Sequence, residues 1–110
     1  MNRIPMSPAA AALLRALAGR AGVPRDRILL SDAQSVDWRS LTFSGERHEL
    51  HLRVPGPDSR VIVERLCDGL ENAEFSIPGV IVADVGVART ESTPDGSTSI
   101  TIEALTVAED

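Results

Sequence analysis

The fold class of this chain is decided near its C-terminus, where two alternating stretches read VIVADVGVART at residues 80–90 and SITIEALTV at residues 99–107. Between them stands Thr93-Pro94-Asp95-Gly96, and Pro, Asp and Gly are residues that β-turns prefer. Alternation of apolar and polar residues is typical of a strand with one buried face. The two stretches therefore predict an antiparallel β-hairpin.

The same alternation predicts the register of this hairpin. On the face expected to be buried, Val87 pairs with Ile102 and Val85 pairs with Ala104. The opposite face is expected to hold the pairs Asp84 with Leu105, Gly86 with Glu103, and Ala88 with Thr101.

A second hairpin is predicted around Ser44-Gly45-Glu46-Arg47, where Gly45 supplies the positive φ of a two-residue turn. Arg27–Ser31 is apolar enough to begin a strand, Asp32–Ser35 is expected to be a bulge or a loop, and regular alternation begins at Val36. The expected core-facing pairs are Phe43 with His48, Leu41 with Leu50, and Arg39 with Leu52. The expected outward pairs are Thr42 with Glu49, Ser40 with His51, and Trp38 with Arg53.

Each hairpin is preceded by a segment of helical periodicity. Ser7-Pro8 is a helix start, since the Ser hydroxyl caps free amides and Pro suits the first helical position, and Gly22 and Pro24 end this helix. Its apolar stripe is Ala10, Leu13, Leu14, Leu17 and Ala21. A second helix is expected from Asp58 or Ser59 to about Leu70, with Ile62, Val63, Leu66, Cys67 and Leu70 as its apolar band.

The order helix, hairpin, helix, hairpin predicts an α+β fold, a four-stranded antiparallel sheet with both helices on one face. We expect residues 1–110 to form a single domain whose ends, 1–6 and 108–110, are flexible. Such a fold leaves one sheet face open. The residues expected on that face are Trp38, Thr42, Glu49, His51, Arg53, Val82, Asp84, Thr101, Glu103, Leu105 and Val107.

The composition narrows the function classes. The chain has 110 residues, 43% hydrophobic and 25% charged, which is the balance of one soluble globular domain. Its basic residues are all Arg, which we interpret as a high-GC bacterial coding bias, and the lack of Lys excludes Schiff-base and phosphate-loop chemistry. A formal net charge of −5 opposes binding to nucleic acid or to an anionic membrane. Arg15 and Arg20 interrupt the apolar part of the N-terminal run, which opposes a signal peptide, so we expect a cytoplasmic protein, and we expect no cofactor.

Candidate chemistry is sparse. In His48-Glu49-Leu50-His51 the two histidines of a strand point to opposite faces, so they do not share a metal ion. His48 is expected on the core side, hydrogen-bonded to a backbone carbonyl. The lone Cys67 lacks a basic partner that would activate it, and no nucleophile elbow is present.

One cluster on the open face remains as a candidate site. His51, Glu49, Asp84 and Glu103 would lie on the same side of the sheet, where carboxylates beside an imidazole suit acid–base catalysis or a divalent cation. These four residues are the basis of an alternative hypothesis, a small enzyme or metal-binding protein.

The leading hypothesis is a protein-interaction or small-ligand-binding module without catalysis. An open face that mixes Trp, Val and Leu with charges is more apolar than a solvated surface requires, and a second copy is the simplest partner, which predicts a homodimer. The expected interface residues are Trp38, Arg53, Val82, Leu105 and Val107, with Trp38 either stacked on Arg53 or anchoring the contact. An accessory subunit of a different protein is a further possibility.

Overall fold

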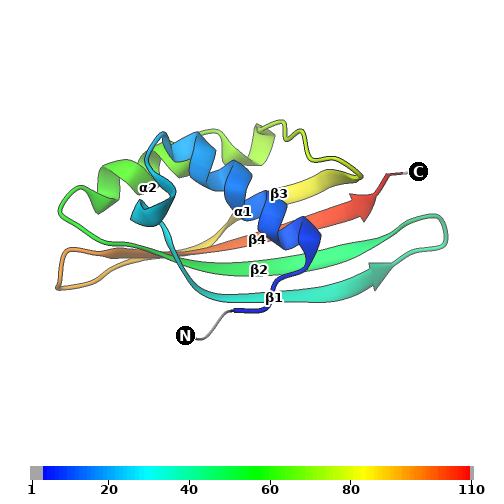
Figure 1. Cartoon of the computed structure of the whole chain (residues 1–110), viewed down its shortest axis with the longest axis horizontal. Helices are drawn as coiled ribbons and strands as arrows, with labels where there is room; N and C mark the ends of the chain where they lie inside the picture. The colour runs from blue at the N-terminus through cyan, green and yellow to red at the C-terminus, as the bar shows by residue number, and fades with distance from the viewer. Residues whose placement is uncertain (1–3, 110) are drawn as a thin grey trace.

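The computed structural model describes residues 4–109, which form two layers, with both helices on one face of a four-stranded antiparallel sheet (Figure 1). The elements follow in the order α1 (Pro8–Ala21), η1 (Arg25–Arg27), β1 (Leu29–Arg39), β2 (Ser44–Val54), α2 (Ser59–Cys67), η2 (Leu70–Asn72), β3 (Val80–Ser92) and β4 (Thr98–Ala108). The strands lie in the order β1-β2-β4-β3, and the two hairpin turns lie at opposite ends of the sheet (Figure 1). The predicted α+β fold is confirmed.

The first helix forms as its sequence signals predict. The Ser7 hydroxyl accepts a hydrogen bond from the Ala10 N–H at 3.1 Å, and Pro8 is the first helical residue. At the other end Gly22 adopts φ 69°, a left-handed conformation that Gly reaches without a steric penalty. The apolar stripe of α1 is buried against the sheet.

The core lies between the helices and the two inner strands, β2 and β4. These strands contribute side chains that are at most 3% exposed, namely Leu50, Leu52, Val54, Ile100, Ile102 and Ala104. Their partners from the helices are equally buried, including Leu13, Leu17, Ile62 and Leu66. Each fully buried Leu or Ile contributes about 1.5–3 kcal/mol relative to an exposed one, so this layer supplies most of the folding free energy.

The predicted register of the β3–β4 hairpin is confirmed in its central part. Val85 faces Ala104, Val87 faces Ile102, and the pairs Asp84–Leu105 and Gly86–Glu103 also form. The pair Ala88–Thr101 was wrong, because a bulge at Ala88 places Arg89 opposite Thr101. A second bulge, at Ala83, likewise reverses the faces of the residues before it.

The predicted register of the first hairpin was wrong. Its turn is Ser40–Phe43, with Arg39 opposite Ser44, and Asp32–Ser35 is part of β1, whose bulge lies at Ser31. The Ser40 N–H donates to the Phe43 carbonyl at 2.8 Å, and the Ser40 hydroxyl accepts from the Phe43 N–H at 3.0 Å.

The expected turn residue Gly45 instead lies inside β2, opposite Trp38 on one side and Val107 on the other. A Cβ at Gly45 would collide with the Thr106 carbonyl and lie 2.8 Å from the Val107 Cα. Gly is therefore required by the close approach of β2 and β4, and not by a turn. Leu41, predicted to face the core, is fully exposed in the turn.

The ends of the described chain belong to the domain. Of the segments expected to be flexible, residues 1–3 and 110 lie outside the described residues, whereas Met6 packs against the core and Ala108 belongs to β4. The Glu109 N–H donates to the Gly79 carbonyl at 3.0 Å. Within residues 4–109, no helix is long and apolar enough to cross a membrane.

Candidate interaction surface

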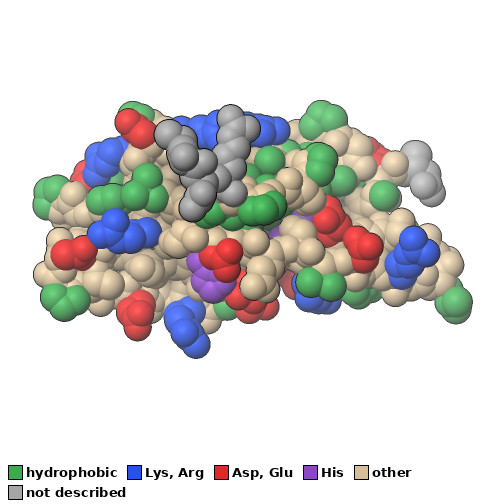
Figure 2. All heavy atoms as spheres, turned by 60° about the horizontal axis from the view of Figure 1, so that its bottom comes forward, with side chains coloured by type: hydrophobic (Ala, Val, Ile, Leu, Met, Phe, Trp, Pro, Cys, Tyr) green, Lys and Arg blue, Asp and Glu red, His purple; other side chains and the backbone are tan. Residues whose placement is uncertain are grey.

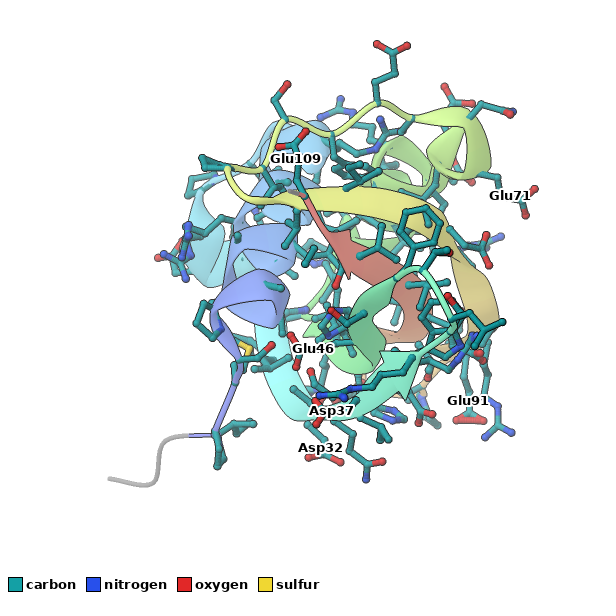
Figure 3. The ribbon with its side chains drawn as sticks, turned by 90° about the vertical axis from the view of Figure 1, so that its right-hand side faces the viewer. Asp32, Asp37, Glu46, Glu71, Glu91 and Glu109 are labelled. Carbon is teal, nitrogen blue, oxygen red and sulfur yellow. The ribbon has the colours of Figure 1, made fainter. Side chains whose placement is uncertain are left out.

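The sheet face opposite the helices is the surface on which the sequence placed the candidate site. Viewed along the strands, α1 and α2 lie on one side of the sheet and the other side is open (Figure 3). The pairing of the strands arranges the side chains of this open face in five rows that run from β1 through β2 and β4 to β3. The rows are Trp38–Gly45–Val107–Ile81, Val36–Arg47–Leu105–Asp84, Gln34–Glu49–Glu103–Gly86, Asp32–His51–Thr101–Arg89 and Leu29–Arg53–Ser99–Glu91.

The five rows differ in character. The first row is entirely apolar and adjoins the β1–β2 turn, where Phe43 is 55% exposed. The second, fourth and fifth rows each hold acidic and basic side chains, and the third row holds the two carboxylates of Glu49 and Glu103 without a basic side chain. On the β1 side of the molecule, charges of both signs lie close together and hydrophobic side chains form small separate groups (Figure 2). The open face is therefore mixed, with its apolar part at one end.

Three of the four candidate site residues are neighbours. The His51 Nε2 lies 2.6 Å from the Glu49 Oε1, and the His51 Nδ1 lies 3.3 Å from the Thr101 hydroxyl oxygen. Glu103 stands directly opposite Glu49 on β4. The imidazole is thus held by a carboxylate and a hydroxyl on the open face.

Asp84 does not join these three residues. It lies on β3, two strands away from β2, so its Cα is about 12 Å from that of Glu49 and about 17 Å from that of His51, by the strand spacing and rise. A shared reacting atom would need all groups within hydrogen-bond reach. Within residues 4–109, no three His, Cys, Asp or Glu side chains come together in a way that could hold a metal ion.

Asp84 instead lines a hollow at the β3 edge together with Glu71 of η2 and Glu103 of β4. Gly86 also lines this hollow, and a Cβ there would lie 3.9 Å from the Glu71 side chain. Figure 3 shows Glu71 beside the β3 edge of the sheet.

His48 lies on the core side, as predicted, and is 1% exposed. Its Nδ1 is 2.7 Å from the Ser35 hydroxyl and its Nε2 is 2.8 Å from the Thr106 hydroxyl, so its partners are two hydroxyls and not the backbone carbonyl that we expected. Burial lowers the pKa of His48 below its usual value, and the Glu46 carboxylate partly offsets this effect. The imidazole bridges β1 and β4 in neutral form.

The expected Trp38–Arg53 stack is absent, because the two residues lie in the first and last rows, about 26 Å apart along the strands. The Arg53 guanidinium donates to the Asp95 carboxylate at 2.7 Å. Hydrogen bonds from Ser97 and Thr93, and the contact with Arg53, hold the pKa of Asp95 well below its usual range.

The other expected interface residues divide between the two faces. Leu105 and Val107 lie on the open face, Leu105 half-buried and Val107 8% exposed. Val82 lies on the helix-covered face and packs against the core, because the bulge at Ala83 brings Ile81 to the open face in its place. Cys67 is half-buried at the end of α2, where burial raises the pKa of its thiol.

Sequence reasoning missed most of the open-face residues of the two edge strands, and four of them bear on the arguments below. These are Asp32 and Val36 on β1, and Ile81 and Arg89 on β3; Val36 is 64% exposed and Ile81 is 48% exposed. Finding them needs the strand order and the bulges, and no local signal in the sequence gives either.

The fold is that of a small two-layer α+β protein whose sheet has one open face. No family model matches the chain, and no curated protein matches it. A chain of a solved structure described as "Virion of native gene transfer agent (GTA) particle" has a similar fold, with a TM-score of 0.55 and 17% sequence identity, over 94% of this chain and 89% of that chain. At this identity the likeness shows the fold alone.

Proposed function

We propose that this protein is a structural subunit of a virion-like particle and acts through protein–protein contacts, including contacts with its own copies. The observation that carries the proposal is the fold shared, over nearly its whole length, with a chain of a gene transfer agent virion. One fold can serve many functions, so support for an assembly role must also come from the surface of this chain.

Two features of the surface favour an assembly role. The open face carries an apolar row at one end, and large apolar side chains are exposed at its margins and in the adjoining turn, where Leu41 projects fully into solvent. Exposed apolar residues grouped beside polar ones are common where proteins meet.

A catalytic role on the same face has less support. His51, Glu49 and Glu103 are neighbours, but Asp84 lies beyond hydrogen-bond reach, and the His51 ring already binds a carboxylate and a hydroxyl. Particle assembly explains the same face without requiring a reaction.

The proposal is tested in the cells that encode the protein. Particles released by these cells are purified on a density gradient, and each fraction is analysed by quantitative mass spectrometry. We expect the protein to co-sediment with the particles in a fixed ratio to their other subunits, and deletion of its gene to leave particles incomplete. A protein found only outside the particle fractions, with particles unaltered by the deletion, would contradict the proposal.

A further inference from the structure

The five rows of the open face suggest which partner this face fits. Asp32 and Arg89 stand at opposite ends of one row, on the two edge strands, with three strand spacings or about 14 Å between their Cα atoms. They are too far apart to pair within one chain. Among residues 4–109, the ion pairs are Arg27–Asp58, Glu49–His51 and Arg53–Asp95, so neither residue takes part in one.

We propose, building on the structural role above, that two copies pack open face to open face about a two-fold axis that runs along the strands between β2 and β4. Such an axis places β1 of one copy over β3 of the other, and β2 over β4. It does not shift positions along the strands, so each row of one copy lies over the same row of the other. The product is a four-layer dimer with the two sheets inside and the helices outside.

This symmetry pairs opposite ends of each row, and in the first and fourth rows the two ends are complementary. In the fourth row, Asp32 of each copy meets Arg89 of the other, which gives two ion pairs per dimer. In the first row, Trp38 meets Ile81, which joins two apolar side chains that border the same apolar end. One operation therefore matches the ends of the first and fourth rows in hydrophobicity and in charge.

The shape of the face fits the same arrangement. In the third row, the Gln34 side chain of one copy lies over Gly86 of the other, which has no side chain and lines the hollow at the β3 edge. The exposed Val36 stands one row away on the same strand. The side chains that project from β1 thus meet the recessed part of β3.

The area of the face is sufficient for a stable dimer. Four strands of about 11 residues cover about 19 Å by 36 Å, or about 700 Å² per copy, by the spacing and rise of β-strands. The total of about 1,400 Å² falls within the range of about 1,200–2,000 Å² for specific protein interfaces. Aligned sheet-on-sheet packing is also the usual geometry of β-sandwiches.

Three kinds of contact oppose the dimer. Val36 of each copy would lie over Asp84 of the other, and Leu29 over Glu91, so that an apolar side chain faces a carboxylate in both rows. In the third row, Glu49 of each copy would lie over Glu103 of the other, which brings side chains of like charge together. The His51 imidazole is hydrogen-bonded to Glu49, and the Arg47 guanidinium stands in the next row, so one positive group borders this contact. The dimer is thus expected to tighten when one of these carboxylates is removed.

Charge reversal tests the symmetry directly. The substitution Asp32→Arg places an arginine over Arg89 in both contacts of the fourth row, and Arg89→Asp places an aspartate over Asp32. The dimer Kd of each variant alone should therefore be at least about 10-fold higher than that of the wild type. An equimolar mixture of the two variants restores opposite charges in both contacts. We expect the mixture to form a heterodimer with wild-type affinity, measured by sedimentation velocity and native mass spectrometry at low salt.

Matched controls separate this effect from a general change of charge. Arg60→Asp and Glu64→Arg, on the exposed side of α2, alter the charge equally and should leave dimerisation unchanged. Glu103→Gln should strengthen the dimer several-fold, and circular dichroism verifies that every variant is folded. This last variant keeps the test informative if a charge reversal disturbs the fold.

The outcomes separate the two proposals. A wild-type dimer that is insensitive to both reversals, or variants whose mixture stays monomeric, would overturn this face and axis while leaving the particle role intact. A wild-type chain that stays at 11.7 kDa up to millimolar concentration would overturn the dimer itself. Absence from the particle fractions, with a dimer that behaves as described, would overturn only the structural role.

Discussion

The glycine at the crossing of β2 and β4 gives the sharpest test of the register. In Gly45→Ala, the added Cβ would collide with the Thr106 carbonyl and lie 2.8 Å from the Val107 Cα. Both obstacles are backbone atoms, so no side chain can rotate away, and the two strands must separate near the end of their ladder. Overpacking of this kind costs about 1–3 kcal/mol, and each weakened hydrogen bond adds about 1 kcal/mol.

We therefore expect Gly45→Ala to lower the free energy of unfolding by about 2–4 kcal/mol, which corresponds to a fall in Tm of roughly 10–25 °C for a domain of this size. The measurement is thermal and urea unfolding followed by circular dichroism. Gly19→Ala is the matched control, since nothing lies within 4 Å of a Cβ at this exposed position of α1. It should raise the stability by about 0.5–1 kcal/mol, because Ala suits a helix interior better than Gly. If Gly45→Ala were as stable as wild type, β2 and β4 would not approach as described.

Two further predictions concern the core. In the folded protein the pKa of His48 is lowered, so the imidazole of the unfolded chain takes up a proton at a higher pH than that of the folded chain. His48 should therefore lower the free energy of unfolding as the pH falls from about 6.5, the usual His pKa, towards the lowered pKa. Above about pH 6.5 it should have no such effect. His48→Gln should flatten that part of the stability profile measured by urea unfolding between about pH 5 and pH 8, and an unchanged slope would contradict a buried neutral imidazole. Leu50→Ala, at a fully buried position of β2, should cost about 2–5 kcal/mol, whereas Leu41→Ala in the exposed turn should change stability by less than about 0.5 kcal/mol. Equal effects of the two Leu substitutions in the same unfolding assay would show that the turn has been misplaced.

The two hairpins show why one register followed from the sequence and the other did not. In the β3–β4 hairpin, Pro94, Asp95 and Gly96 mark the turn, and alternation on both sides agrees with it. In the first hairpin, the true turn around Leu41 has no Gly, Pro or Asn, while Gly45 offers a stronger turn signal nearby. Local signals therefore favoured the wrong turn.

The residues of the candidate site also divide into those that local alternation places together and those that only the strand order places. The neighbours His51 and Glu49 lie two apart on one strand, so alternation alone places them on one face. Glu103 joins them only through the pairing of β2 with β4, and Asp84 is separated from them by the strand order. The position of Val82 was misassigned because a bulge reverses alternation without altering composition.

The amino-acid sequence by itself determined the first helix, the start of the second, the β3–β4 hairpin, the α+β class and the side of the sheet that holds His48, because capping, turn chemistry and periodicity act between residues close in the chain. The second helix was expected to reach about Leu70 but ends at Cys67, and Leu70 lies in η2 after the left-handed Gly69. Only the tertiary structure decided the strand order, the turn at Ser40–Phe43 and the rows that bring Asp32 and Arg89 into line on opposite edges. These features depend on contacts between segments far apart in the chain, such as His48 with Thr106, and are selected by the packing of the whole core.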